Sequence, residues 1–440
     1  MLAGLYPSDV HPKTLLAIDD DGNRVCYGDL DQLKTMWATK VPGRRLVALS
    51  CQNTTASLAA YIGLHAAGHA VILLSTKMAD PARDDLIARY GIEAVITDDS
   101  VTLLAEPSGD LHPDLAVCLS TSGSTGSPKL VQFSTAQLAA NAVAIADYLD
   151  LSSSDQPLAH LPLEYSYGLS VVHSHMAVGA TLLLTEHGVM QKPFWERLKD
   201  ATSLSGVPFH FEMLLRMRLG RADLPKMRML TQAGGRLGAK EATALYDMAT
   251  EKGWQFHIMY GQTEAGPRIS WLPFDKMSGH LDCIGQPIPG VTLDLTDEGE
   301  VVVHSPAVMW GYAEKRTDLN KGDQMNGVLQ TGDLAEQIDG LYRITGRKSR
   351  FIKLQGNRVG LADVEARLAD AGHTVWCVGR DDALCMFSQD PDIDAVRKTA
   401  VALFSFPARS MTIHVLEEPP RRSNDKVDYA ALQTLSEELI

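Results

Sequence analysis

At residues 121–129 the chain reads Thr-Ser-Gly-Ser-Thr-Gly-Ser-Pro-Lys, and this run is the most informative part of the sequence. The glycines let backbone N–H groups turn toward an anion, the hydroxyls add short donors, and the lysine adds a positive charge. The run therefore predicts a phosphate-binding loop, with a flexible Ser/Gly surface loop as the alternative. A Walker A loop is excluded, because Pro128 stands where that motif needs glycine and no Ser or Thr follows Lys129. The candidate phosphate-binding residues are Thr121, Ser122, Gly123, Ser124, Thr125, Gly126 and Lys129.

Short apolar runs at 115–119 and 130–133 flank this loop, so we expect it to join two strands. The same alternation of apolar runs and helical patterns continues along the chain. Strands are predicted at 46–49, 70–74, 94–97, 181–185, 227–230 and 256–259, and helices at 56–67 and 136–149. Repeated β-α alternation predicts an α/β fold of layered sheets with parallel strands.

The alternation of predicted strands and helices ends in the last third of the sequence. Residues 299–304 are a short segment with three consecutive valines, and turns follow it, as in a small β-rich subdomain. Beyond residue 348 we expect helices at 361–370 and 392–404 and strands near 375–378 and 411–415.

Composition sets bounds on the class of protein. A chain of 440 residues is too long for one ordinary core, so two or more domains are expected. No apolar stretch approaches the roughly 20 residues of a membrane span, and the first residues lack a leader pattern, so we expect a cytoplasmic protein. The six cysteines show no C-x-x-C spacing, which favours reduced, mostly buried thiols. A net charge of −14 argues against a nucleic-acid partner.

Further blocks follow the loop in a fixed order: Tyr260-Gly-Gln-Thr-Glu264, Thr331-Gly-Asp333, Gly346-Arg347 and finally Lys426. Their order and spacing resemble the adenylate-forming superfamily, which includes acyl- and aryl-CoA synthetases, adenylation domains of nonribosomal peptide synthetases and luciferases. The motifs are closest to those of AMP-dependent acyl-CoA synthetases, and the resemblance covers nearly the whole chain. It implies a large N-terminal domain, residues 1–347, and a small mobile α+β domain, residues 348–440.

The resemblance also implies a reaction, in which a carboxylate attacks the α-phosphorus of ATP and pyrophosphate leaves. Thr263 would then contact the α-phosphate and Glu264 would coordinate Mg²⁺. Lys426, on a loop of the small domain, would bridge the carboxylate and the α-phosphate. The nucleotide would be held by Tyr260 stacked on adenine, the backbone at Gly234 and Gly235, Asp333 on the ribose and Arg347 near the ribose or phosphate.

A thiol acceptor is implied for a second step. Gly356 matches the segment that lines the pantetheine path in thioester-forming relatives, which implies CoA or the phosphopantetheine of a carrier protein as partner. The small domain would rotate between the steps, with Ser349 at the position of the usual pivot.

The carboxylic acid is less well defined by the sequence. The segment from Pro162 to Leu169 resembles a family motif, with Tyr165 in place of the usual histidine. The F-D-x-S signature of amino-acid-activating domains is absent, which favours a non-amino acid. The pocket candidates are Tyr165, Tyr167, Gly168, His210, Gly234 and Arg268.

The chain departs from the family pattern in several places. Ile258 stands where an amide is usual, Asp425 replaces the glycine that usually precedes the lysine, and the segment between Tyr27 and the phosphate loop is short. Two alternatives to an acid–thiol ligase therefore stay open: a non-catalytic relative that binds nucleotide or acyl ligand, and a ligase that passes the adenylate to a non-thiol acceptor.

Overall fold

A computed structural model describes residues 5, 7, 9–97, 100–121, 129–348, 350–354, 357–404, 410–422 and 425–439. The α-helices are α1 (Leu30–Lys40), α2 (Thr55–Ala66), α3 (Asp80–Tyr90), α4 (Thr135–Tyr148), α5 (Ser166–Met176), α6 (Lys192–Leu198), α7 (Pro208–Arg216), α8 (Ala239–Lys252), α9 (Leu361–Asp370), α10 (Ile393–Phe404) and α11 (Tyr429–Glu438). Short 3₁₀ turns are η1 (Tyr27–Asp29), η2 (Leu219–Arg221), η3 (Thr263–Ala265), η4 (Phe274–Lys276) and η5 (Arg316–Asn320).

The first sheet has the strand order β18-β8-β7-β4-β3-β5-β6. Its members are β3 (Leu46–Cys51), β4 (Ala70–Ser75), β5 (Ala94–Thr97), β6 (Ser100–Leu103), β7 (Leu115–Thr121), β8 (Lys129–Ser134) and β18 (Tyr312–Ala313). Strands β7, β4, β3 and β5 run parallel, while β8 turns back antiparallel to β7. The candidate phosphate loop thus joins two paired strands, as predicted.

The second sheet has the order β15-β14-β13-β12-β11-β9-β10-β1-β2. Its members are β1 (Leu15–Ile18), β2 (Arg24–Cys26), β9 (Pro157–Ala159), β10 (Leu182–Leu184), β11 (Ser203–Gly206), β12 (Met229–Gln232), β13 (Gln255–Tyr260), β14 (Ser270–Leu272) and β15 (Gln286–Pro287). Its centre, from β1 to β13, is parallel. Because parallel strands need crossover connections, helices separate most of these strands along the chain.

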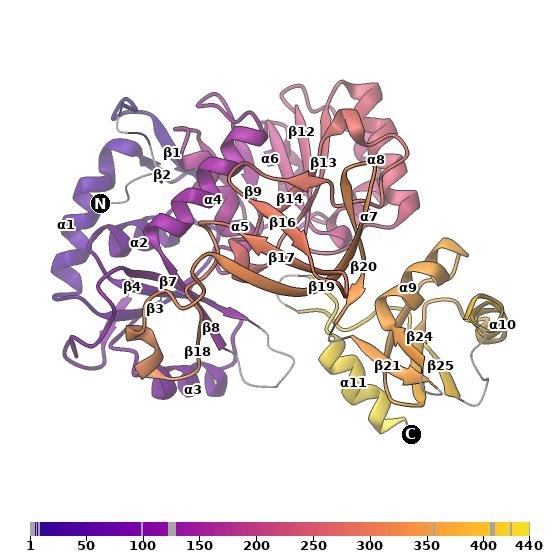
Figure 1. The fold of residues 1–440 in the computed structure, drawn as a ribbon. Helices are drawn as coiled ribbons and strands as arrows, with labels where there is room; N and C mark the ends of the chain where they lie inside the picture. Colours follow the sequence, from indigo (N-terminus) through magenta and orange to yellow (C-terminus); the bar gives the residue numbers. More distant parts are fainter. Residues whose placement is uncertain are drawn as a thin grey trace.

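The two sheets share one buried apolar cluster with the helices between them. Leu49 and Val71 come from the first sheet, Leu182 from the second, Leu58 from α2 and Leu169 from α5. Figure 1 shows these layers in the larger body of the molecule. The layered α/β fold predicted from the apolar runs is therefore confirmed.

A third, antiparallel sheet, β16-β17-β19-β20, corresponds to the expected β-rich subdomain. It comprises β16 (Thr292–Leu295), β17 (Glu300–His304), β19 (Val328–Ile338) and β20 (Leu341–Arg347). The strands after it are β21 (Phe351–Leu354), β22 (Asn357–Gly360), β23 (Val375–Arg380), β24 (Ala383–Ser388) and β25 (Met411–Val415).

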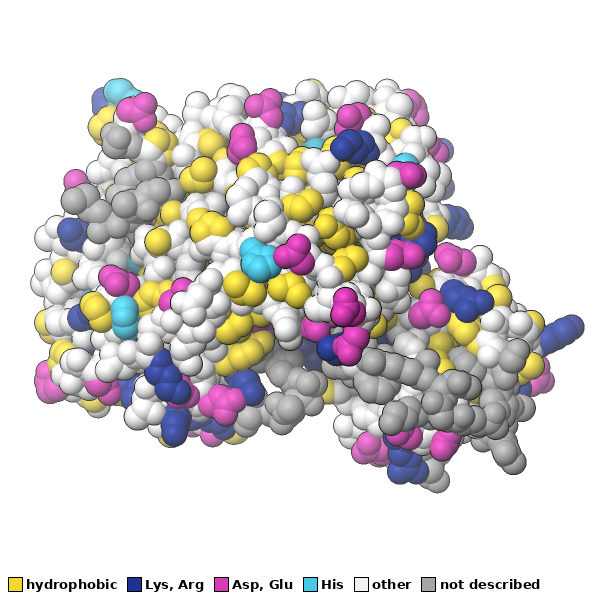
Figure 2. All heavy atoms as spheres, viewed as in Figure 1, with side chains coloured by type: hydrophobic (Ala, Val, Ile, Leu, Met, Phe, Trp, Pro, Cys, Tyr) yellow, Lys and Arg dark blue, Asp and Glu magenta, His cyan; other side chains and the backbone are white. Residues whose placement is uncertain are grey.

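The C-terminal elements have an apolar core of their own, which includes Ile352, Val364, Cys377, Met386 and Val396. In Figure 1 they project from the lower right of the larger body, and Figure 2 shows the same outline with side chains of both charges scattered over this face. The exact division at residue 347 stays a prediction.

Local capping explains how the strand after the phosphate loop leads into a helix. Ser134, the last residue of β8, is the N-cap of α4, and its Oγ accepts from the backbone N–H of Gln137 at 3.4 Å. The Gln137 side chain in turn accepts from the N–H of Ser134 and donates to the Val308 carbonyl. This capping box fixes the start of α4 against the segment that precedes β18.

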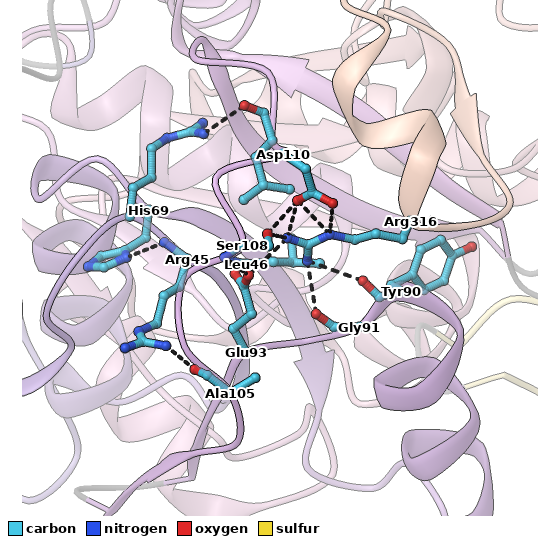
Figure 3. A network of polar contacts seen from close by, with 12 residues as sticks. Arg45, Leu46, His69, Tyr90, Gly91, Glu93, Ala105, Ser108, Asp110 and Arg316 are labelled. Carbon is cyan, nitrogen blue, oxygen red and sulfur yellow. Dashed lines mark hydrogen bonds and ion pairs between the residues drawn. The ribbon is translucent and has the colours of Figure 1, made fainter.

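A buried polar network fastens η5 to the first sheet (Figure 3). Glu93 accepts from the N–H groups of Leu46 and Ser108, both at 2.8 Å, and pairs with Arg316 at 3.0 Å. Arg316 also reaches Asp110 at 2.6 Å. Burial alone would raise the pKa of Glu93, but these bonds hold it below its usual value, so the carboxylate remains an acceptor for three partners.

The cysteines are free thiols, and all except the half-buried Cys26 are buried, as expected for a reduced chain. Among the described helices none is long and apolar enough to cross a membrane.

Candidate active site

The candidate phosphate loop is described only at its two ends. Ser122, Gly123, Ser124, Thr125 and Gly126 lie outside the described residues, as do Ser349 and Gly356. The ends are well defined, because Thr121 and Lys129 are register partners in the β7–β8 pair. The described ends of the candidate loop thus lie side by side on two paired strands.

Lys129 and Glu264 meet through a residue that the sequence motifs did not reveal. Tyr312 of β18 donates its hydroxyl to Glu264 Oε1 at 2.8 Å, and Lys129 Nζ lies 5.6 Å from the centre of the Tyr312 ring. Lys129 Nζ also lies 2.5 Å from Glu314 Oε1. Strand β18 brings Tyr312 and Glu314 there because it pairs with β8.

Thr263 and Glu264 begin the 3₁₀ turn η3 directly after β13. Thr263 Oγ1 lies 2.9 Å from Ser166 Oγ of α5, and the Glu264 carbonyl accepts from the Met309 N–H at 2.9 Å. Both backbone and side chain of this turn are thus fixed by neighbouring elements.

The surroundings of Glu264 fit a nucleotide-bound Mg²⁺. Among the described residues no group of three or more His, Cys, Asp or Glu side chains could hold a metal ion by itself. Mg²⁺ is commonly bound by one or two carboxylates together with substrate phosphates and water. One carboxylate beside a predicted phosphate loop is that kind of donor set.

Asp333 is the centre of a polar network between the second and third sheets. Its Oδ2 accepts from the Tyr260 hydroxyl at 2.6 Å and from Gln262 Nε2 at 2.7 Å. Its Oδ1 lies 2.7 Å from Nε of Arg347, which is its register partner across β19 and β20. Burial and then the Asp333 charge raise the pKa of Tyr260, which remains a neutral donor. Three predicted nucleotide contacts, Tyr260, Asp333 and Arg347, are therefore assembled at one point.

Lys426 reaches from the C-terminal part of the chain into this region. Its Nζ lies 5.2 Å from the centre of the Tyr165 ring. Gly234, with a φ of +87°, provides the necessary space: a Cβ there would lie 2.6 Å from the Tyr165 hydroxyl and 3.2 Å from Lys426 Cε. Gly234 thus has a steric role beside the lysine, whereas Gly235 packs against Pro208.

The charge on Lys426 is sensitive to its surroundings. Burial and the nearby Arg347 cation lower the pKa of Lys426 to about 8, while the Glu264 carboxylate opposes this change. The lysine therefore titrates close to neutral pH, and anions brought in beside it would favour its charged form.

Asp425, one of the departures from the family pattern, has a structural explanation. Its φ of +60° is left-handed, a conformation that glycine adopts freely and aspartate tolerates better than most residues. Its Oδ2 lies 3.0 Å from His210 Nε2. His210 Nδ1 accepts from the Val207 N–H at 3.3 Å, so its Nε2 carries the proton and donates to Asp425. This pair joins the lysine loop to the start of α7.

The remaining pocket candidates lie around α5. Tyr167 is buried, donates its hydroxyl to the Thr231 carbonyl at 2.8 Å, and its ring centre lies 3.9 Å from Cζ of Arg268. Gly168 allows close packing of the backbone, because a Cβ there would collide with the Pro162 carbonyl oxygen. Ile258 is buried in an apolar cluster of the second sheet.

Comparison with known proteins agrees with this geometry. Residues 104–313 match the family model described as AMP-binding enzyme. The chain is 28% identical over 294 residues to the D-alanine–D-alanyl carrier protein ligase of Staphylococcus haemolyticus, covering 64% of this chain and 60% of that enzyme. It is also 28% identical over 350 residues to the 2-succinylbenzoate–CoA ligase of Bacillus cereus, covering 72% and 70% of the two chains.

Solved structures show the same fold. An ATP-bound chimera of RpMatB and BxBclM superposes with a TM-score of 0.82 at 19% identity, covering 100% of this chain and 99% of the other. The o-succinylbenzoate CoA synthetase MenE of Bacillus subtilis, in complex with its acyl-adenylate intermediate, superposes with a TM-score of 0.78 at 22% identity and 94% coverage of both.

Residues 104–313 are similar to AMP-binding enzymes, in agreement with the motifs, and the chain has the fold of the solved chimera and MenE structures. The family match and the named ligases are similar to this chain in the part that carries the motifs of the expected class, the AMP-forming acid–thiol ligases. The matched region spans less than two thirds of the staphylococcal relative.

Proposed function

We propose that this protein activates a carboxylic acid with ATP and transfers the acyl group to a thiol. In the first step a carboxylate oxygen bonds to the α-phosphorus of ATP and pyrophosphate leaves, which produces an acyl-adenylate. In the second step a thiol sulfur bonds to the acyl carbon, its proton is lost, and AMP leaves. The thiol belongs to CoA or to the phosphopantetheine of a carrier protein.

The observation that carries this proposal is the position of Lys426. It lies within 5.2 Å of the Tyr165 ring centre and against Gly234, although it is far in sequence from both. Arg347 and Glu264 are close enough to shift its pKa. A lysine drawn into a site that already contains nucleotide-binding candidates is the arrangement that adenylation requires, because two anions must be brought together and neutralised.

The roles of the other residues follow from chemistry. Asp333, fixed by Gln262 and Arg347, is placed to accept hydrogen bonds from ribose hydroxyls. The Thr263 hydroxyl, beside Ser166, is a donor for an α-phosphate oxygen. Glu264 would hold Mg²⁺, which supplies charge neutralisation on the phosphates. Lys426 donates to the oxygens that gain negative charge as the carboxylate attacks.

We propose the thiol step and the domain division together. Residues 348–440 would rotate so that Lys426 leaves and a pantetheine arm passes Gly356. The separate apolar core of the C-terminal elements supports such a movement. The cytoplasmic location expected from the sequence stays a prediction.

The test is pyrophosphate release with ATP, Mg²⁺ and a panel of carboxylic acids, followed by a thioester assay with CoA or a phosphopantetheinylated carrier protein. Acid-dependent pyrophosphate followed by thiol-dependent AMP release is the expected result. ATP binding without pyrophosphate release for every acid would support a non-catalytic relative. Pyrophosphate release with an adenylate that only amines or hydroxyls consume would contradict the thiol step.

A further inference from the structure

Arg268 is a buried cation that no carboxylate pairs with in the part of the chain that the structure describes. Its side chain is 2% exposed, among the largest fully buried side chains of the protein. Its Nη1 donates to the Pro267 carbonyl at 3.3 Å, and its Cζ lies 3.9 Å from the Tyr167 ring centre. Its Nε has no hydrogen-bond partner, and no carboxylate among the described residues pairs with the guanidinium.

Burying the Arg268 charge in this way is energetically unfavourable unless a ligand supplies a counter-charge. An arginine keeps its charge in proteins, so burial cannot be relieved by loss of a proton. Buried charges are normally paired, because removing an ion from water without a partner is unfavourable. The cation–π contact with Tyr167 and a side-chain hydrogen bond with Tyr148 offset only part of this cost. The planar guanidinium with a free Nε–H presents the donors that a carboxylate accepts in a bidentate pair.

Tyrosines surround Arg268 and connect it to the reaction centre. Burial raises the pKa of Tyr148, Tyr165 and Tyr167, and the positive charge of Arg268 opposes that rise at all three. The Tyr165 and Tyr167 ring centres are 6.1 Å apart, and Lys426 lies over the far end of this pair. Each cation thus lies over a different ring of this pair, Arg268 over Tyr167 and Lys426 over Tyr165.

Apolar side chains pack around these tyrosines. Val207, Ala233 and Met259 belong to the same buried cluster as Tyr167, and Tyr165 packs against it. Lys426 and Arg268 contact the two tyrosine rings beside this cluster, Lys426 over Tyr165 and Arg268 over Tyr167.

We propose that the acid activated by this protein carries a second carboxylate, and that Arg268 binds it. This inference rests on the proposed ligase function. The reacting carboxylate lies toward Lys426 and Thr263, and the second one accepts from the Arg268 guanidinium. A substrate ammonium group is disfavoured there by like charge, which agrees with the missing F-D-x-S signature.

The test is substrate selectivity. We would measure kcat/KM for pyrophosphate release with four diacids: malonate, succinate, glutarate and phthalate. Each diacid is compared with the monoacid of matching carbon skeleton, which is propionate, butyrate, pentanoate or benzoate respectively. At least one diacid should exceed its matched monoacid by about 100-fold or more, because a monoacid leaves the buried cation unpaired. Arg268→Met, which keeps the length of the side chain without its charge, should bring that ratio close to one.

Two further variants separate recognition from folding. Arg268→Lys keeps a positive charge beside the Tyr167 ring but lacks the planar guanidinium that can donate two parallel hydrogen bonds to a carboxylate. The ratio of kcat/KM for a diacid to that for its matched monoacid should therefore fall about 10-fold. Arg221→Met, at an exposed arginine of η2, should keep the wild-type ratio. If Arg268→Met does not fold, the diacid-to-monoacid ratios of the wild-type enzyme and of Arg268→Lys still test whether Arg268 binds a second carboxylate. A wild-type enzyme that treats every pair alike, or a ratio unchanged in Arg268→Lys and Arg268→Met, overturns the proposal.

A calorimetric titration distinguishes this inference from the proposed function. If no acid supports pyrophosphate release, the ligase proposal fails by itself. Succinate and phthalate that bind the wild-type protein more tightly than butyrate and benzoate, with the difference lost in Arg268→Met, would still support an anion site at Arg268. If each diacid and its matched monoacid bind with equal affinity, Arg268 does not form an anion site.

Discussion

Asp425 Oδ2 lies 3.0 Å from His210 Nε2, which joins the loop that carries Lys426 to the start of α7. Burial alone would raise the pKa of Asp425, but the hydrogen bond from His210 and the charge of Arg421 hold it below its usual value. Arg421 also donates to the Asp425 carbonyl at 2.8 Å and lies over the Phe209 ring. The loop is therefore fastened in the position that places Lys426 near Tyr165.

Asp425→Gly should slow pyrophosphate release about 10-fold, since a hydrogen bond to a charged group contributes about 1.5 kcal/mol or more. Glycine accepts the left-handed backbone, so only the contact with His210 is lost. Asp425→Asn keeps an acceptor oxygen and tolerates the same φ, and should stay near the wild-type rate. Thioester formation from supplied acyl-adenylate should not change in either variant. An Asp425→Gly enzyme that loses both half-reactions equally would contradict this role.

The lowered pKa of Lys426 predicts an alkaline limit on the first step. The ammonium is present below pH 8 and is lost above it, because burial and Arg347 lower its pKa to about 8. In pyrophosphate assays, kcat/KM for ATP should fall about 10-fold per pH unit above that value, since this parameter reports the free enzyme. In Lys426→Arg the guanidinium keeps its proton, so kcat/KM should not fall in this way above pH 8, whatever the absolute rate of the variant. The same fall in kcat/KM above pH 8 in the wild type and in Lys426→Arg would show that another group titrates.

Glu264→Gln tests the metal contact. The amide keeps an oxygen that can accept from the Tyr312 hydroxyl, so the melting temperature should change little. Loss of the anionic ligand should slow pyrophosphate release on the order of 100-fold and raise the Mg²⁺ concentration required for half-maximal rate. A Mg²⁺ titration identical to that of the wild type would remove Glu264 from the metal site.

Asp333→Ala tests the nucleotide contact. We expect calorimetry with a non-hydrolysable ATP analogue to show binding weakened by about 2 kcal/mol, because ribose hydroxyls lose a charged acceptor. Glu336→Gln is a matched control, since Glu336 lies on the same strand, is exposed and pairs with Arg343 at 2.7 Å. Wild-type affinity in Asp333→Ala would place the nucleotide elsewhere.

The sequence was a good guide to the elements and a poor one to contacts between distant segments. Apolar runs such as 70–74 and 115–119 became β4 and β7, because a strand covered on both faces must be continuously apolar. The motif Tyr260 to Glu264 was recognisable since its residues are adjacent. Tyr312 was not, because β18 reaches β8 only through tertiary pairing across the first sheet.

Burial and side-chain direction were equally hidden from the sequence. Arg268 could be named as a pocket candidate, but its unpaired Nε is a property of packing against Tyr167. The sequence showed Asp425 only as a departure from the glycine usual in the family, whereas the structure gives it a left-handed φ and a contact with His210.

The most direct test of the central claim compares the two half-reactions of Lys426→Ala. We would measure pyrophosphate release with the preferred acid, and thioester formation from its synthetic acyl-adenylate with CoA or a carrier protein. If Lys426 serves adenylation alone, pyrophosphate release should be abolished while thioester forms from the supplied adenylate at close to the wild-type rate. Equal loss of both half-reactions, or normal pyrophosphate release, would contradict the account.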